Sequence, residues 1–323
     1  MTQQTEVADR VTSAVPWGRR LWRIGLLLIL IDVFAGSLIV GLQMRQWMWE
    51  YTKPARFRYD IGRNYLFGRQ AVEQGYLNVY ENQVKFRPDE AHKMNYPPLR
   101  YGTFGVWAWW NQKHFANYDQ WQEDHSFNAF VMYFNTVLEF LAAVAALLIV
   151  RHWIWRTGPP IPQPTIWDRL FRGGFRYTLA FLLVWFNIGM IVSAHGWPSW
   201  DMWVVPFFLW TVLLCCWEKW FLAGVCLGVG VMFKGQQLAV LPVFVLWPIF
   251  AGQPGRALRF LSGFVLAFGL IVSGWMLSYR PEIAFDKKER ILDWPAIWWV
   301  VTCGAAVLLA NAWRLVSFIV AAR

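Results

Sequence analysis

Asp60 is the first residue of this sequence whose type and surroundings could do chemistry. It lies in Arg58-Tyr59-Asp60-Ile61-Gly62-Arg63, a short way past the first long apolar run. The positive charges of Arg58 and Arg63 favour the ionised carboxylate. An ionised carboxylate at the edge of an apolar segment can accept a proton as a general base. The plainer interpretation is an aspartate in a solvated loop.

Lys234 is the second candidate, and it stands between two apolar runs in Phe233-Lys234-Gly235-Gln236-Gln237. Each run is too short to cross a bilayer comfortably, so the turn is expected to be recessed. An ionisable group at depth in a membrane is costly and is a functional hypothesis by default. A lysine there suits a lipid phosphate as a point charge, with Gln236 beside it. In the alternative interpretation, the lysine stem only carries its charge to the surface.

A histidine and an aspartate come together in the segment Ser193–Asp201, where His195 and Asp201 flank a glycine, a proline and two tryptophans. Two apolar runs meet here, so both side chains are expected at one surface. The alternative is a tight polar hairpin with an interfacial histidine. Tyr96 opens a further segment, Tyr96-Pro97-Pro98-Leu99, whose proline pair suits the first turn of a helix.

Eight apolar runs must position these residues, and all but the short fifth and sixth approach the length of a bilayer-spanning helix. They are Leu21–Met44, Phe127–Val150, Tyr177–Ala194, Trp200–Trp217, Trp220–Phe233, Gln237–Phe250, Leu258–Ser278 and Ala296–Val320. The first run is longer than the apolar core of a signal peptide, and no small-residue cleavage site follows it. We therefore expect a retained helix and an all-α, polytopic transmembrane bundle of about eight spans.

A polar, aromatic-rich segment, residues 45–126, separates the first two runs. It is too long for a connector, and its tyrosines and tryptophans argue against disorder. Within it, Tyr96–Trp110 is apolar but short for a span, which predicts an interfacial or re-entrant helix. Residues 1–20 are expected to be a cytoplasmic tail, and residues 21–323 a single transmembrane domain that includes this outside loop.

Basic residues in the short connections predict the topology. One set precedes or opens the first run, a second follows the second run and a third separates the sixth and seventh: Arg10, Arg19, Arg20 and Arg23; Arg151, Arg156, Arg169, Arg172 and Arg176; Arg256 and Arg259. With eight spans all three sets lie on one side, which is the cytoplasm by the positive-inside rule. Both termini are then inside, and residues 45–126 lie outside.

Composition narrows the class of function. The chain is 57% hydrophobic and 15% charged, whereas soluble domains carry about 25% charge. The basic residues behind the net charge of +10 lie mainly beside apolar runs. We therefore interpret them as determinants of membrane topology and not as a nucleic-acid binding surface. The cysteines Cys215, Cys216, Cys226 and Cys303 lie in apolar runs, and no His/Cys/carboxylate cluster has metal-ligand spacing. No metal or cofactor is expected.

Most of the 24 tryptophans are interpreted as an aromatic belt at the span ends, including Trp47, Trp49, Trp153 and Trp200.

The order of these motifs resembles the GT-C superfamily of integral-membrane glycosyltransferases. An early Asp60 in the first outside loop is followed by Gly75-x(4)-Tyr80 and by Tyr96-Pro97-Pro98-Leu99. Later come an outer turn with Gly196, a glycine-rich run at 222–228, and Lys234 before Leu241-Pro242. Over residues 15 to 255 the chain looks most like the bacterial polyprenol-phosphate-mannose-dependent mannosyltransferases, often called the GT87 family. It has His195-Gly196-Trp197 where that family commonly has Gly-Gln, and Lys234-Gly235 where it has Lys-Pro.

The resemblance implies an inverting glycosyltransferase of the cytoplasmic membrane whose active site faces outside. The donor would be a polyprenyl-phosphate sugar, with a hexose such as mannose, and the acceptor a lipid or glycan. Asp60 matches the base position; Lys234, with His195 or Arg63, would meet the donor phosphate, and Tyr96, Asp201 and Gln236 would contact substrate. Two alternatives remain open: a non-enzymatic transporter or lipid-handling protein, and a membrane acyltransferase with a buried histidine.

Overall fold

The computed structural model describes residues 17–52, 58–75, 84–87, 90–92, 97–114, 125–161, 168, 175–196 and 200–276. Helices make up nearly all of this part of the chain. They are α1 (Trp17–Thr52), α2 (Arg58–Gln74), α4 (Pro98–His114), α5 (His125–Thr157), α7 (Phe175–Trp185), α8 (Ile188–Ile191), α9 (Val204–Cys216), α10 (Trp220–Phe233), α11 (Leu241–Phe250) and α12 (Pro254–Met276). The turn η3 (Val192–Gly196) is a π-helix, and η4 (Trp200–Trp203) and η5 (Gly235–Val240) are 3-10 helices.

Helices occupy the first seven predicted spans, and the eighth, residues 296–320, lies outside the described residues. Within the described part, four helical stretches are long and apolar enough to cross a membrane: Leu21–Thr52, His125–Thr157, Arg176–Gly196 and Pro254–Trp275. Three more, at Trp200–Cys216, Trp220–Phe233 and Gly235–Phe250, are apolar but shorter. The prediction of a helical fold is confirmed for these residues, and the long apolar helices are compatible with an integral membrane protein.

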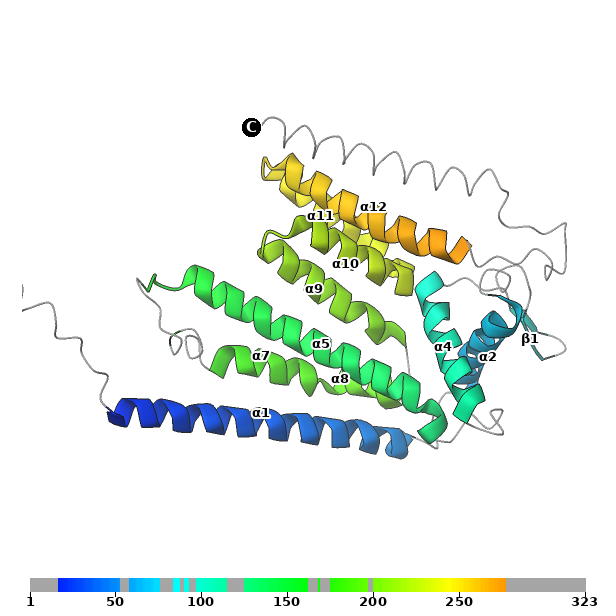
Figure 1. The fold of residues 1–323 in the computed structure, drawn as a ribbon, viewed down its shortest axis with the longest axis horizontal. Coiled ribbons are helices and arrows are strands. Elements are labelled where there is room, and N and C mark those ends of the chain that lie inside the picture. The colour runs from blue at the N-terminus through cyan, green and yellow to red at the C-terminus, as the bar shows by residue number, and fades with distance from the viewer. Residues whose placement is uncertain are drawn as a thin grey trace, which may run out of the picture.

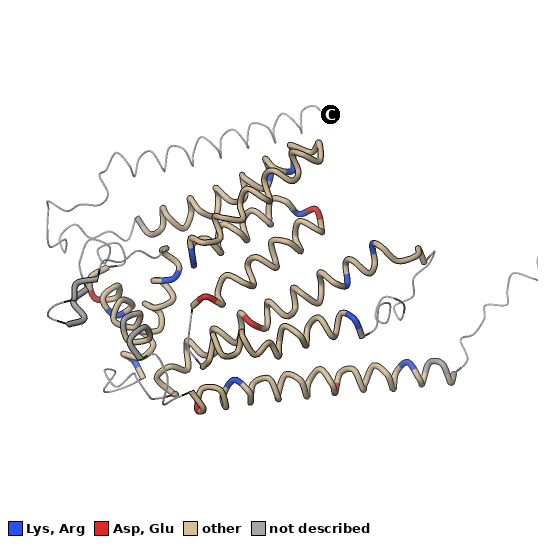
Figure 2. Tube along the Cα trace, turned by 180° about the vertical axis from the view of Figure 1, so that it is seen from behind, with Lys and Arg blue, Asp and Glu red and all other residues tan. Residues whose placement is uncertain are grey.

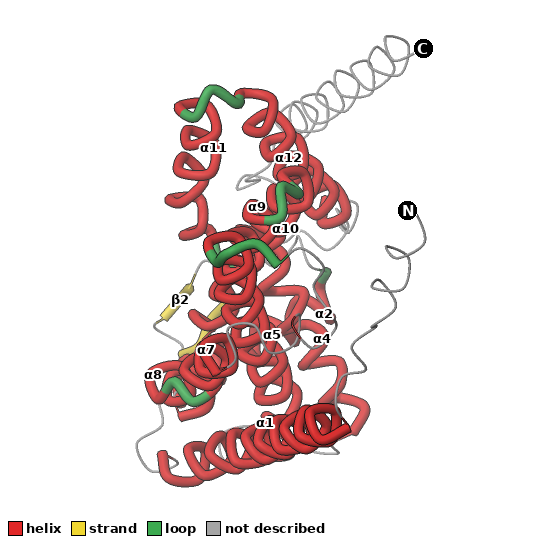
Figure 3. Tube along the Cα trace, turned by 90° about the vertical axis from the view of Figure 1, so that its left-hand side faces the viewer, coloured by secondary structure: helices red, strands yellow, loops and turns green. Residues whose placement is uncertain are grey.

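The long helices lie roughly parallel, side by side (Figure 1). In order across the molecule they are α1, then α7 with α8, then α5, α9, α10 and α12 with α11, so that α1 and the α11–α12 pair form opposite edges (Figures 1 and 3). The two helices of the predicted outside segment, α2 and α4, gather at one end of this bundle. The bundle therefore has two different ends, one of which α2 and α4 cover.

Figure 2 shows lysines and arginines at both ends of the bundle, and those of the short connections lie at the end opposite α2 and α4. Because successive long helices run in opposite directions, that end contains the start of α1, the end of α5, the start of α7, the α9–α10 turn and the α11–α12 turn. These ends carry Arg23; Arg151 and Arg156; Arg176; Lys219; and Arg256 and Arg259. The described members of the three basic sets thus share one side, as the sequence predicts.

The predicted outside segment is structured where it is described. Helix α2 packs on α4 so closely that a Cβ atom at Gly68 would lie 2.2 Å from the Phe104 carbonyl oxygen. Helix α2 ends at a turn through Gly75, with φ of 100°, and α4 begins at Pro98, as expected from the proline pair. The segment also contains a hairpin that was not predicted, in which β1 (Val84–Arg87) pairs antiparallel with β2 (Glu90–His92).

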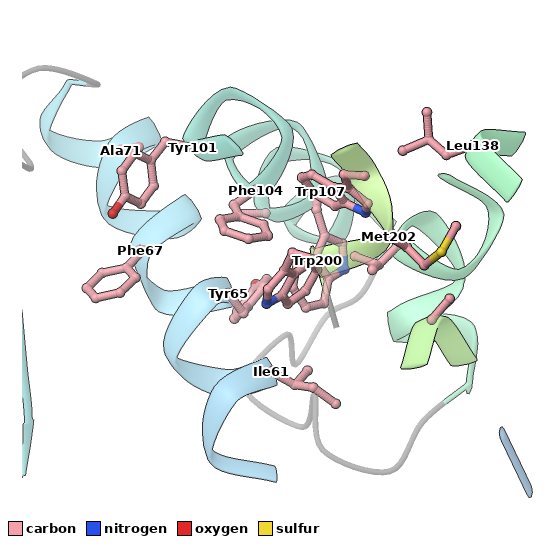
Figure 4. Packing of buried hydrophobic residues seen from close by; sticks show 14 of the residues in the cluster. Ile61, Tyr65, Phe67, Ala71, Tyr101, Phe104, Trp107, Leu138, Trp200 and Met202 are labelled. Carbon is pink, nitrogen blue, oxygen red and sulfur yellow. The ribbon is translucent and has the colours of Figure 1, made fainter. Parts of the chain in front are cut away.

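A buried aromatic cluster joins α2 and α4 to the membrane helices (Figure 4). Its members come from α2, α4, α5, η3 and η4: Ile61, Tyr65, Phe67, Ala71, Tyr101, Phe104, Trp107, Ala108, Phe127, Val131, Leu138, Ala194, Trp200, Met202 and Trp203. Trp200 and Trp49, both assigned to an aromatic belt, are buried, at 5% and 0% exposed. Trp47 and Trp153 are exposed, at 59% and 66%, as a belt requires.

Helices α10 and α12 pack backbone against backbone. A Cβ at Gly224 would lie 1.9 Å from the Phe260 carbonyl oxygen, and one at Gly263 would lie 2.0 Å from the Phe221 carbonyl oxygen. With Gly228, Gly224 forms the small-xxx-small spacing that lets two membrane helices approach closely. This contact fixes α10, and therefore Lys234 at its end.

Candidate functional site

The structure brings two of the predicted site residues together as an ion pair. The Lys234 ammonium donates a hydrogen bond to Asp201 Oδ1 across 33 residues of sequence. The lysine side chain is 16% exposed and that of Asp201 is 66% exposed, so the pair faces outward on the carboxylate side. A lysine ammonium has three donors. One donor meets Asp201, which leaves two for a further acceptor.

Lys234 is held by the change of helix type around it. Helix α10 ends at Phe233, the Lys234 N–H still donates to the Gly230 carbonyl at 3.1 Å, and the Lys234 carbonyl accepts from the Gln237 N–H at 3.2 Å. The Gln237 amide nitrogen donates to the Val204 carbonyl, which ties η5 to the first residue of α9. Gln236, the predicted neighbour, is exposed on η5. Backbone hydrogen bonds to residues before and after Lys234 therefore hold its position.

Asp201 is held by the tryptophans on either side of it. Trp200 and Trp203 are buried in the aromatic cluster. The Trp203 Nε1–H donates to Asn135 Oδ1 at 2.6 Å, and Asn135 Nδ2 donates to the Ala194 carbonyl at 2.7 Å. Asn135 on α5 thus links the two sides of the outer turn. Burial of the tryptophans turns Asp201 outward toward Lys234.

Asp60 and Arg63 lie on α2, and their side chains are outside the described part of the structure. The neighbouring Ile61 belongs to the aromatic cluster together with Trp200 and Met202. Figure 4 shows Ile61 at the α2 edge of the cluster. The first turn of α2 therefore packs on the same cluster as η4, which carries Asp201. Tyr96 lies outside the described residues.

Arg100 is a cation that the sequence interpretation missed, although it follows directly on the Tyr-Pro-Pro-Leu segment. It is 4% exposed on α4. Its guanidinium lies over the Phe104 ring at 5.6 Å and over the Trp200 ring at 5.8 Å from the ring centroids. Because Trp200 directly precedes Asp201, the site region contains a second cation beside Lys234, and this one is buried. Nothing in the sequence indicates whether an arginine that follows a helix-start motif is buried or exposed.

A second polar cluster, the buried triad, lies inside the bundle and consists of Arg45, Glu139 and His195. Their side chains are 3%, 0% and 1% exposed. Arg45 Nε donates to Glu139 Oε2, and His195 Nε2 lies 3.1 Å from the same oxygen. The sequence interpretation placed His195 at a surface turn as a phosphate ligand, and the structure engages its Nε2 atom with Glu139. Glu139 was missed because it is a single charge within an apolar run.

Two further donors of Arg45 are satisfied by the backbone. Its two terminal nitrogens donate to the Gly41 carbonyl at 2.8 Å and the Trp185 carbonyl at 3.0 Å, and its guanidinium stacks 3.7 Å from the centroid of the Trp185 ring. Glu139 Oε1 and His195 Nδ1 are buried without a hydrogen-bond partner among the described residues. The triad therefore joins α1, α5 and η3, with one acceptor oxygen still unused.

The described residues contain no group of three or more His, Cys, Asp or Glu side chains that could hold a metal ion. The thiols of Cys215, Cys216 and Cys226 are free, and Cys226 Sγ lies 3.4 Å from the Phe207 carbonyl oxygen. The arrangement offers a cation paired with a carboxylate at one end of an apolar bundle. Such a pair can bind an anionic group and orient it.

Comparison of the chain with protein-family models, with curated proteins and with solved structures found no match.

Proposed function

We propose that this protein is an integral-membrane glycosyltransferase that takes a sugar from a polyprenyl-phosphate donor, with Lys234 contacting the donor phosphate. The observation that carries the proposal is the position of the Lys234–Asp201 pair. Lys234 follows a helix of 14 residues, which is about 21 Å long, against a hydrocarbon core of about 30 Å. This helix is several ångströms shorter than the core, so the lysine stem has to reach outward from its end for the ammonium to meet a donor phosphate in the headgroup region.

The chemistry divides between two residues. Lys234 has two donors left for phosphate oxygens, and it would stabilise the charge that develops as the phosphate leaves. Asp60, on the helix that packs against the same aromatic cluster, would remove the proton from the acceptor hydroxyl. One carboxylate suffices in an inverting displacement at the anomeric carbon, because phosphate leaves without a second acid. Arg100, buried against Trp200, adds positive charge to the same region.

The topology supports an outer-face site. The Lys234–Asp201 pair lies at the bundle end that α2 and α4 cover, and the basic residues of the short connections lie at the other end. By the positive-inside rule the basic end is cytoplasmic. The donor chain would then lie among lipid-facing apolar residues of the short helices near the site. We place the protein in the cytoplasmic membrane, with the acceptor, a lipid or glycan, arriving from outside.

The test is a rate measurement in membranes with labelled polyprenyl-phosphate sugars and extracted lipid or glycan acceptors. Asp60→Asn keeps size and polarity but cannot accept the proton, so we expect turnover to fall by about 10² to 10⁴-fold with donor binding retained. Asp201→Asn is the matched variant at the other carboxylate, and it should weaken donor binding more than turnover. Wild-type rates in Asp60→Asn would remove this residue from the mechanism.

A transporter is the second candidate, and the buried triad favours it. Ionisable groups inside membrane helices often mark proton or ion pathways. In that case liposomes containing the protein would show a proton or ion flux that Glu139→Gln abolishes. Transfer of labelled sugar without any such flux would show that the protein is a glycosyltransferase and not a transporter.

A further inference from the structure

Two polar residues of α5, Asn135 and Glu139, stand one helical turn apart and so lie on one face of the helix. Both reach toward the same outer segment. Asn135 bonds the Ala194 carbonyl and the Trp203 indole, while Glu139 contacts His195. Both η3 and η4 are thereby held to α5. Asp201 lies in η4.

The π-helical turn η3 lets His195 reach Glu139. Its five residues, Val192–Gly196, contain one more residue per turn than an α-helix would, and such turns occur frequently at functional sites. On its other side η3 packs on the end of α1, where a Cβ at Gly196 would lie 3.1 Å from Thr52 Cγ2 and 3.2 Å from Met48 Cγ. The turn is fixed between α1 and α5, with the triad in the contact.

Burying a carboxylate in a membrane bundle is expensive unless it is paired. Glu139 is fully buried, and Arg45, on a different helix, supplies the compensating charge. The pair leaves Glu139 Oε2 aimed at His195 Nε2. An apolar residue at 139 would fill the space without holding the turn. The charge of Glu139 therefore serves to hold the η3 turn.

We propose that Glu139 is a positioning residue that holds η3 and η4 in the register in which Asp201 meets Lys234. Arg45 fixes the carboxylate, the carboxylate fixes His195 in η3, and Asn135 ties η3 to η4, which presents Asp201 to the ammonium. What the ion pair binds rests on the proposed function, but the positioning itself does not. The links from His195 to Asp201 run through Asn135, backbone and Trp203. None of those groups titrates, which distinguishes this role from a proton pathway.

Hydrogen–deuterium exchange of the protein in lipid nanodiscs tests the positioning without any assay of activity. Loss of a hydrogen bond to a charged group should raise the opening equilibrium of residues 192–204 by about tenfold or more in Glu139→Leu. In Glu139→Gln, which retains an acceptor oxygen, the opening equilibrium should rise less. Phe260→Ala, a buried change between α10 and α12, is the destabilised control that should leave residues 192–204 unchanged. Unchanged exchange in both Glu139 variants, or an equal rise in the control, would overturn the proposal.

A double-mutant cycle tests the connection to Lys234, with a polyprenyl phosphate as the probe ligand. If Glu139 acts through the ion pair, Lys234→Ala combined with Glu139→Gln should bind the probe no more weakly than Lys234→Ala alone. Additive losses would mean that Glu139 only stabilises the fold, and they would refute the positioning role. Binding that Lys234→Ala leaves unchanged refutes the proposed function instead, and exchange of residues 192–204 then decides the positioning alone.

Discussion

Substitution of Gly224 by alanine should separate α10 from α12. The added Cβ would meet the Phe260 carbonyl oxygen at 1.9 Å and the Phe264 nitrogen at 2.8 Å. Both are backbone atoms, so no side-chain rotation relieves the contact. To reach ordinary contact at 3.4 Å, α12 must retreat by about 1.5 Å. That movement loosens buried contacts of Leu227 and Phe260, which are both 0% exposed.

The magnitude follows from two opposing effects. Overpacking of a close contact costs about 1–3 kcal/mol, and a backbone contact belongs at the upper end of that range. Alanine in place of glycine in a helix returns up to about 1 kcal/mol. We therefore expect Gly224→Ala to lower the free energy of unfolding by about 2 kcal/mol. Gly269→Ala on α12 is the matched control, because nothing lies within 4 Å of its added Cβ.

The assay is equilibrium unfolding in mixed detergent micelles, followed by tryptophan fluorescence and circular dichroism. Gly269→Ala should leave the free energy of unfolding unchanged or raise it slightly. Gly224→Ala should lower it and, because α10 carries Lys234, should also weaken binding of a polyprenyl phosphate. Equal unfolding free energies for the two variants would refute the view that α10 and α12 pack backbone against backbone.

Three further predictions concern the charged residues and the topology. Lys234→Ala should weaken donor binding more than stability, and Lys234→Arg should retain part of the binding because the charge remains; wild-type binding by Lys234→Ala would leave the lysine as a surface anchor only. In a topology test, a thiol reagent applied from outside should modify a cysteine placed at Asn82 and spare one at Gln163, and labelling at Gln163 would contradict the topology. Asp32 is exposed on α1 within a candidate span, so Asp32→Leu should favour insertion of that helix by about 3 kcal/mol in a translocon assay, and no gain would place Asp32 outside the hydrocarbon.

The sequence predicted the members of the Lys234–Asp201 pair because each interrupts apolar residues at the end of a run. It did not predict that they meet, because 33 residues and two helices separate them. Arg45 was assigned to the outside segment, yet α1 continues to Thr52 and buries it. An arginine at the end of an apolar run has the same appearance whether it faces water or a buried carboxylate.

The sequence by itself determined the predominantly helical, apolar character of the protein, the places of the first seven predicted apolar helices and the side on which the basic residues of the short connections lie. These properties depend on the cost of exposing polar backbone or charge to lipid, which acts locally along the chain. Only the tertiary structure decided that Glu139 joins Arg45 to His195, that Arg100 lies over Trp200 and that Gly224 touches the Phe260 backbone. Each of these contacts depends on which faces of distant helices meet, and the packing of the whole bundle determines that choice.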